Sequence, residues 1–155
     1  MEATDDDPRR VVVGAGGFGR ELRDLLRDAG LRVHGFLDDA PSDAVLARGP
    51  ALDAPLLGPT DALVDLEVPF LLGLGWPRVR ASALTRLAAS GRALAPAAVH
   101  PSAVLGRHVE LGPGTVVAPL AVVMTDVRLG PNVLVNYGCT IGHDTTVAEN
   151  AVVMP

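Results

Sequence analysis

The sequence is poor in aromatic side chains, in cysteine and in clustered positive charge, and each shortage excludes a class of protein. Only 3% of its 155 residues are aromatic while 48% are hydrophobic, so the core must be built from Val, Leu and Ala. The single cysteine, Cys139, excludes a disulfide framework within the chain. No apolar run is long enough for a membrane-spanning helix. The net charge of -5, without a Lys/Arg cluster, argues against nucleic acid and anionic membranes as partners.

The N-terminal segment carries the one run of like charge, Asp5-Asp6-Asp7, just ahead of Pro8. An acidic start is unlike a secretory signal peptide, so we expect a cytoplasmic protein. We expect residues 1–9 to form a disordered, solvated tail. The remaining length has room for one ordinary domain or two compact ones.

The first half of the chain alternates strand-like and helix-like segments. Apolar, β-branched runs end in Gly or Asp, and the helical stretches place leucines on one face. The predicted strands cover residues 10–13, 32–37 and 69–73, and the predicted helices cover 21–29 and 79–89. Strands that alternate with helices imply a parallel sheet. We therefore predict a small Rossmann-like, parallel α/β domain over residues 10–95.

The second half has a different period, with an aliphatic residue at every sixth position. Four residues after each of the first nine stands a small or β-branched residue, and the residue directly after the aliphatic one is often Gly or Ala. A six-residue period fits neither a helix nor a hairpin sheet, but it is typical of the hexapeptide repeats of a parallel β-helix. The aliphatic positions are Val99, Leu105, Leu111, Val117, Val123, Leu129, Val135, Ile141, Val147 and Val153.

Stacking explains this pattern. Three hexapeptides make one triangular coil, and each aliphatic residue points inward, where its equivalents stack about 4.8 Å above and below. The second inward position must be small because three faces converge there. We therefore predict a β-helix over residues 96–155. The repeats stop at 153–155 without the atypical cap that normally ends a solenoid, so we expect the β-helix to be incomplete.

Three motifs stand in a fixed order ahead of and within the repeats: residues 12–21 (VVGAGGFGRE), 35–39 (GFLDD) and 141–144 (IGHD). Together with the repeats, this order resembles the sialic-acid O-acetyltransferase and bacillosamine N-acetyltransferase family. The resemblance extends over nearly the whole chain from residue 10 onward. It implies a left-handed β-helix, acetyl-CoA as acyl donor, an amino sugar or nucleotide-linked sugar as acceptor, and a homotrimer with active sites between adjacent prisms. It also implies further coils that supply much of the acetyl-CoA groove.

The glycine-rich loop after the first predicted strand is a candidate nucleotide site. The pattern Gly14-x-Gly16-x-x-Gly19 allows a tight turn and lets a phosphate approach N–H groups at a helix N-terminus. Asp38 lies where a dinucleotide enzyme holds a ribose hydroxyl, which makes an NAD-dependent oxidoreductase a rival interpretation. Against that rival, this half has room for only about one mononucleotide-binding unit.

The resemblance assigns this pocket to the nucleotide of a UDP-sugar or to a related sugar substrate, with a vestigial turn as the alternative. The family commonly has a sugar-contacting histidine where this chain has Phe18, which leaves the identity of the substrate open. Asn136 is a candidate for lining the acceptor site, although it could equally make a side-chain ladder or a turn bond. The predicted substrate-binding residues are Gly14, Gly16, Gly17, Phe18, Gly19, Asp38, Asp39 and Asn136.

His143 and Asp144 are the predicted catalytic residues. An imidazole can take a proton from an amine or hydroxyl as it attacks a thioester, which is worth about 10²–10⁴-fold in rate. The resemblance implies that His143 is this base and that Asp144 orients or polarises it. Adjacent residues of a flat strand point to opposite faces, so Asp144 can serve His143 only if the corner turns the chain. A solvated corner pair is the alternative, and no metal site is predicted.

Two functions therefore remain open from the sequence. The first is an acetyl-CoA-dependent N- or O-acetyltransferase of the hexapeptide-repeat type. The alternative is a non-catalytic sugar-nucleotide-binding or assembly module without a complete acetyl-CoA site, which Phe18 and the expected incompleteness of the β-helix favour.

Overall fold

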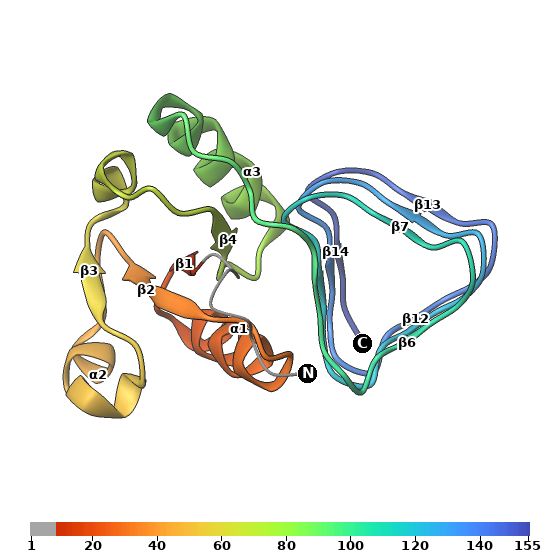
Figure 1. The fold of residues 1–155 in the computed structure, drawn as a ribbon, viewed down its shortest axis with the longest axis horizontal. Helices are drawn as coiled ribbons and strands as arrows, with labels where there is room; N and C mark the ends of the chain where they lie inside the picture. The colour runs from red at the N-terminus through yellow and green to blue at the C-terminus, as the bar shows by residue number, and fades with distance from the viewer. Residues whose placement is uncertain (1–8) are drawn as a thin grey trace.

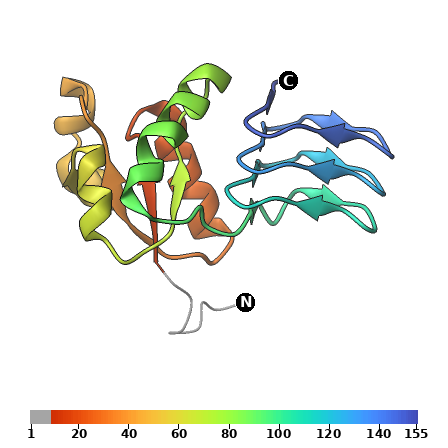
Figure 2. The same ribbon diagram turned by 90° about the horizontal axis from the view of Figure 1, so that it is seen from above.

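The computed structural model describes residues 9–155, so the predicted tail, apart from Arg9, lies outside the described residues. The chain forms an α/β part followed by a triangular prism of short strands, and the two pack side by side (Figures 1 and 2). No helix in the described part of the chain has both the length and the apolar character needed to cross a membrane.

The α/β part is built on a four-stranded parallel sheet in the order β3-β2-β1-β4. Helix α1 covers one face of the sheet and helix α3 covers the other (Figure 1). Short helical turns connect the remaining strands. The elements are β1 (Arg10–Val13), α1 (Gly17–Asp28), β2 (Val33–Leu37), α2 (Asp43–Leu46), η1 (Gly49–Leu52), β3 (Leu56–Gly58), η2 (Thr60–Asp65), β4 (Phe70–Leu72), α3 (Pro77–Leu87) and η3 (Ala88–Ser90).

Strand β1 is buried on both faces because its valines alternate between two apolar clusters. Val12 joins the cluster that contains Leu22 of α1, whereas Val11 and Val13 join the cluster that contains Leu87 of α3. A strand covered on both faces is expected to be a continuous β-branched run.

The predicted helices exist, but both begin earlier than the hydrophobic pattern indicates. Helix α1 begins at Gly17 rather than at residue 21, because the chain turns into the helix within the glycine loop. Helix α3 begins at Pro77, which occupies the first turn, where its missing N–H costs nothing. Strand β3 was not predicted, since its three residues are too few to show a period.

The second part is a parallel β-helix whose strands stack in three sheets, β14-β11-β8-β5, β12-β9-β6 and β13-β10-β7. Val116 of β8 pairs with Leu134 of β11, 18 residues later, as three hexapeptides per coil require. Figure 2 shows the coils stacked one above another. The strands are β5 (Ala98–Val99), β6 (Val104–Leu105), β7 (Glu110–Leu111), β8 (Val116–Val117), β9 (Val122–Val123), β10 (Arg128–Leu129), β11 (Leu134–Val135), β12 (Thr140–Ile141), β13 (Thr146–Val147) and β14 (Val152–Val153).

Most of the predicted inward positions of the repeats form the interior of the prism, but Leu105 in the first coil is exposed and lies outside the interior cluster. This apolar cluster contains the other aliphatic positions and most of the small positions together, and Cys139 is one of its buried members. Burial raises the pKa of the Cys139 thiol, which disfavours the thiolate that a nucleophile would need.

The three outer faces of the prism differ in their surroundings. Ala98, Val116 and Leu134 are buried in the same cluster as the leucines of α1, so the β14-β11-β8-β5 face is the one that docks on the α/β part. On the β13-β10-β7 face, the outward side chains Glu110 and Arg128 are exposed and form an ion pair at 3.4 Å. The third face, β12-β9-β6, is partly exposed and partly apolar.

Candidate functional site

The glycine loop between β1 and α1 is shaped by close backbone contacts. Gly14 has a φ of 102°, which favours glycine, and a Cβ added to Gly19 would overlap the Gly14 carbonyl oxygen. At Gly16 and Gly17, by contrast, an added Cβ would meet nothing within 4 Å. Gly14 and Gly19 are therefore required by the fold, whereas Gly16 and Gly17 leave the backbone open to a ligand at the start of α1.

Asp38, at the carboxyl end of β2, holds this loop. Its Oδ2 accepts a hydrogen bond from the Ala15 N–H at 2.8 Å, and its Oδ1 accepts one from the Ala40 N–H at 2.9 Å. Each carboxylate oxygen of Asp38 therefore already accepts a hydrogen bond from a backbone N–H. The visible role of Asp38 is to fix the loop, which weakens the case for it as a free ribose ligand of an NAD site.

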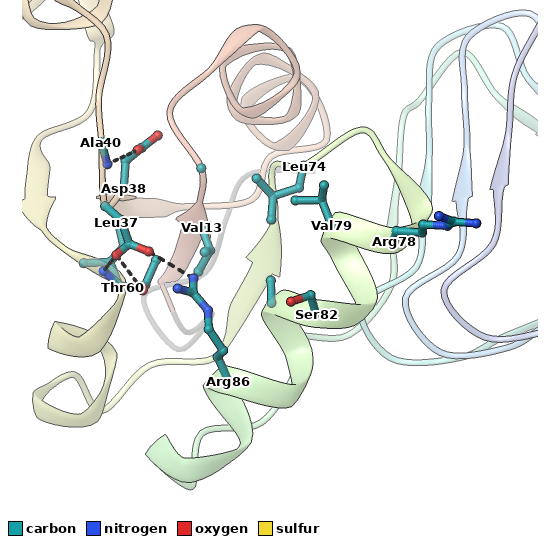
Figure 3. A pocket seen from close by; sticks show the side chains of 13 residues that line it. Val13, Leu37, Asp38, Ala40, Thr60, Leu74, Arg78, Val79, Ser82 and Arg86 are labelled. Atoms are coloured by element: carbon teal, nitrogen blue, oxygen red, sulfur yellow. Dashed lines mark hydrogen bonds and ion pairs between the residues drawn. The ribbon is translucent and has the colours of Figure 1, made fainter.

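A cleft of about 480 Å³ opens beside Asp38 at the carboxyl ends of β1, β2 and β4 (Figure 3). Helix α3 closes its other side, with Ser82 and Arg86 turned toward it. Asp39 contributes a carboxylate to the same cleft. Ligands of open α/β sheets bind at this edge of the sheet.

The Asp39 carboxylate is held by three donor groups, two from Thr60 and one from Arg86. Its Oδ1 accepts hydrogen bonds from the Thr60 hydroxyl at 2.7 Å and from the Thr60 N–H at 2.8 Å, and its Oδ2 pairs with Arg86 at 3.0 Å (dashed lines beside Thr60 and Arg86 in Figure 3). The hydrogen bond from the Thr60 hydroxyl and then that from its N–H, assisted by Arg86, hold the pKa of Asp39 below its ordinary value. The cleft therefore presents a fixed negative charge next to a cation.

A second cleft, of about 450 Å³, lies where the α/β part meets the prism. Phe18 at the start of α1, Trp76 before α3 and Tyr137 at a prism corner line it. These are the only Trp, the only Tyr and one of the three Phe of the chain. A chain so poor in aromatics concentrates them at one junction, where flat rings provide contact area for a ligand.

Asn136 lines this second cleft but its side chain is partly committed. Only 7% of the residue is exposed, and its Oδ1 accepts a hydrogen bond from the Tyr137 N–H at 2.9 Å. Its Nδ2 lies 3.4 Å from the Met154 sulfur. The turn bond considered from the sequence is therefore present, and because one N–H of Nδ2 donates to the Met154 sulfur, one amide N–H of Asn136 is left for a ligand.

His143 and Asp144 stand at the corner between β12 and β13. The Asp144 Oδ2 lies 2.6 Å from the His143 Nδ1, and both side chains are about three-quarters exposed, at 73% and 74%. Asp144 has a φ of 57°, and its N–H donates to the Thr125 carbonyl in the coil below. This left-handed corner turns the chain, so that the neighbouring side chains meet instead of pointing to opposite faces.

The bond between the two side chains fixes the imidazole tautomer. An ionised carboxylate only accepts hydrogen bonds, so Nδ1 of His143 carries the proton that Asp144 accepts. The lone pair is then on Nε2, the nitrogen that the carboxylate does not bond. This is the arrangement of a general base with an orienting carboxylate.

The structure separates the predicted residues into three groups. The glycine loop, Asp38 and Asp39 lie at the sheet edge, and Phe18 and Asn136 lie at the junction. The corner between β12 and β13 lies at the end of the prism opposite the α/β part (Figure 1). His143 lines neither of the two clefts.

Several residues at the clefts were not predicted from the sequence, and three of them make the contacts described above. Thr60 and Arg86 hold Asp39, and Tyr137 supplies an aromatic ring at the junction. Tyr137 could have been found from its place beside Asn136, at the corner before the IGHD motif. Thr60 and Arg86 carry no local signal, because they reach Asp39 only through the tertiary fold.

No cluster of His, Cys, Asp and Glu suited to a metal ion occurs within residues 9–155. The first coil also contains His100, which accepts the Ser102 N–H on its Nδ1 and approaches Asp28 of α1 at 3.5 Å. This contact ties the first coil to the α/β part, as expected for a packing histidine.

Comparison with known proteins agrees with this two-part architecture. The model of the PglD N-terminal domain matches residues 10–87. Comparison of the sequence with curated proteins gives no match.

Several solved structures share the fold over nearly the whole chain. The acetyltransferase domain of PglB from Neisseria gonorrhoeae FA1090, in complex with acetyl coenzyme A, is 24% identical with a TM-score of 0.76, covering 94% of this chain and 70% of that one. A GDP-perosamine N-acetyltransferase from Caulobacter crescentus, a histidine-to-alanine variant in complex with CoA and GDP-perosamine, is 26% identical with a TM-score of 0.63, covering 94% and 88%. WeeI from Acinetobacter baumannii AYE is 21% identical with a TM-score of 0.73, covering 93% and 68%.

These comparisons confirm the predicted fold class, a small Rossmann-like parallel α/β domain followed by a left-handed parallel β-helix. They also confirm the resemblance drawn from the order of the glycine loop, the GFLDD motif and the hexapeptide repeats. The chain therefore belongs to the PglD N-terminal domain family, among the sugar acetyltransferases of the hexapeptide-repeat type.

Proposed function

We propose that this chain is an acetyl-CoA-dependent N- or O-acetyltransferase that acts on an amino sugar or a nucleotide-linked sugar, with His143 as the general base. The observation that carries the proposal is the 2.6 Å bond between Asp144 and Nδ1 of His143 at an exposed corner. The acetyl coenzyme A bound to the PglB domain, and the CoA and GDP-perosamine bound to the Caulobacter enzyme, support the two substrate classes.

In this proposal Asp144 keeps the proton on Nδ1, so that Nε2 can take a proton from the acceptor amine or hydroxyl. Acetyl-CoA supplies the acetyl thioester that the acceptor attacks; as the new bond to the acetyl carbon forms, the C–S bond breaks, and the leaving CoA thiolate takes up the proton that His143 received. As His143 becomes positively charged, the Asp144 carboxylate stabilises it at the same hydrogen bond. The base is thus held in one tautomer and one orientation before the substrate arrives.

The cleft of the α/β domain would hold the nucleotide portion of the acceptor. The start of α1 offers backbone N–H groups at Gly16 and Gly17, with no side-chain cap, which suits a phosphate. Asp39, fixed by Thr60, can accept hydrogen bonds from a base or a sugar hydroxyl. The aromatic junction with Phe18 would hold the sugar, without the donor and acceptor of the histidine that the family commonly has there.

We further propose a homotrimer in which His143 of one chain works on a sugar held by the α/β domain of another. The separation of the cleft from the β12–β13 corner supports this, since they lie at opposite ends of one chain (Figure 1). The β12-β9-β6 face also leaves Val104 exposed, and Leu120 and Met124 are exposed at its two corners. An apolar strip of this kind on a stacked face suits contact with a second prism.

The test is release of CoA thiol from acetyl-CoA in the presence of UDP- or GDP-linked amino sugars. The expected result is acceptor-dependent release that His143→Asn lowers by about 10²–10⁴-fold while the oligomer stays intact. His108→Asn is the matched control, because His108 is also an exposed corner histidine of the prism, and it should leave the rate unchanged.

Two outcomes would overturn the proposal in different ways. Acceptor binding in a calorimeter without any thiol release would indicate a non-catalytic sugar-nucleotide-binding module. Thiol release that His143→Asn leaves unchanged would reject His143 as the base.

A further inference from the structure

Arg80 of α3 is a fully buried arginine at the junction of the two domains, with 0% of its surface exposed. Its Nη1 donates to the carbonyls of Leu72 at 3.1 Å and of Leu74 at 2.8 Å. Its Nη2 donates to the carbonyl of Asn132 at 3.0 Å and to the Asn132 side-chain oxygen. One guanidinium therefore bonds the end of β4 to a corner of the prism.

All of these partners are neutral oxygens. Within residues 9–155 no carboxylate pairs with Arg80, and its buried Nε has no hydrogen-bond partner. Burial lowers the pKa of Arg80 to about 10, so it remains charged at neutral pH although no carboxylate of the described residues neutralises it. A buried ion of this kind is a poor way to gain stability, and an apolar side chain of similar volume is often neutral or better.

What Arg80 provides instead is geometry. The planar guanidinium binds two separate sets of acceptors in a fixed fork, so it fixes both the distance and the angle between them. One set belongs to Leu72 and Leu74, and the Leu74 side chain lines the α/β cleft. The other belongs to Asn132, whose Nδ2 donates to the Asn150 side chain of the next coil at 2.8 Å.

The surroundings reinforce this connection. Helix α3, which carries Arg80, also forms a wall of the α/β cleft through Ser82 and Arg86 (Figure 3). Trp76, immediately before α3, and Pro77, its first residue, line the aromatic junction. Any change in how α3 docks on the prism would therefore move both clefts together.

We infer that Arg80 is a positioning residue that sets the orientation of the α/β domain, and with it the bound acceptor, relative to the prism. The inference rests on the proposed function, in which the acceptor must meet a His143 that belongs to another prism. Displacing reacting groups by about 1 Å can cost on the order of 10²-fold in rate. Arg80 thus acts on catalysis through the docking angle and not through contact with substrate.

The test compares Arg80→Met with Arg48→Met, which alters an exposed arginine at the start of η1. In Arg80→Met we expect kcat to fall about 10-fold or more, while the calorimetric Kd for UDP or GDP changes less than about 2-fold. Arg80→Lys should recover little, because an ammonium cannot bridge both acceptor sets. Asn132→Gly removes the side-chain acceptor while tolerating the φ of 56°, and it should lower kcat in the same way.

A second readout does not depend on activity. Spin labels at Glu67→Cys in the α/β domain and Thr146→Cys on the polar face of the prism, in a Cys139→Ser background, report the distance between the domains. Labelled chains are diluted with unlabelled ones so that each distance is measured within one chain. We expect one narrow distance with Arg80 present and a shifted or broadened one in Arg80→Met.

The two proposals fail in distinguishable ways. If the unmodified chain releases no thiol, the proposed function is wrong, and the label distances still decide the role of Arg80. If Arg80→Met keeps its kcat and its label distance, Arg80 is only structural, even if the melting temperature falls.

Discussion

The α/β domain and the prism present their polar groups in opposite ways. In the α/β domain the polar groups of the candidate site are tied to the fold: Asp38 bonds two backbone N–H groups, and Asp39 bonds both groups of Thr60. At the prism corner His143 and Asp144 are mostly exposed and bond each other. A recognition site can be completed within one domain, whereas an exposed base needs a second surface to exclude water and bring the acceptor.

The largest effect is expected from a substitution that disturbs the backbone contact between Gly19 and the Gly14 carbonyl oxygen in the glycine loop. Gly19→Ala should destabilise the α/β domain by about 3 kcal/mol or more, because its Cβ would overlap the Gly14 carbonyl oxygen. The measurement is the free energy of unfolding in urea. Gly17→Ala is the matched control: an added Cβ there meets nothing within 4 Å, so stability should be unchanged or rise by up to about 1 kcal/mol. Equal losses in both variants would contradict the account of the loop.

The prism can be tested by placing a charge on each of two faces. Val104→Glu, on the exposed apolar face, should raise the dissociation constant of the proposed trimer at least about 100-fold, because an unpaired carboxylate would have to leave water. Thr146→Glu, on the polar face, should leave assembly unchanged. Analytical ultracentrifugation separates the two cases. If the trimer dissociated only in Thr146→Glu, the interface would lie on the β13-β10-β7 face, and our assignment to the β12-β9-β6 face would be wrong.

A smaller effect concerns Asp39. Its pKa is lowered in the fold, so its ionised form stabilises the folded state above the unfolded pKa of about 3.8. That contribution is lost as the pH falls through the still lower pKa of the folded state. The difference in unfolding free energy between the unmodified chain and Asp39→Asn should therefore be constant near pH 6 and shrink below about pH 4. A difference that grows in acid would contradict the assigned hydrogen bonds.

The prism was the easier part to predict, because stacking makes each inward position repeat the same environment. The six-residue period therefore identified the strands and even the buried place of Cys139. The corner at Asp144 was not predicted, although positive φ recurs at the same place of the repeat, as at Asp126 and Asn132. Only that corner lets the carboxylate reach Nδ1 of His143.

The α/β domain gave weaker local signals. The order of strand, glycine loop and helix was readable, but β3 is only three residues long and was missed. Arg78, Arg80 and Arg86 look alike in the sequence of α3, yet Arg80 is buried where α3 meets the prism, whereas Arg86 stays exposed beside Asp39. Burial that depends on contact between domains leaves no period in either one.

The central claim is that recognition and chemistry are supplied by different chains of one trimer. It is tested by co-expressing two variants, His143→Asn and Ser82→Trp, where the tryptophan fills the α/β cleft that Ser82 lines. Each variant alone should be inactive in thiol release. Randomly mixed trimers should recover about a quarter of the normal activity, because about that share of sites combines an open cleft with an intact histidine from the neighbouring chain. Mixed trimers that remain inactive would contradict the account, since they would mean that each chain uses its own histidine.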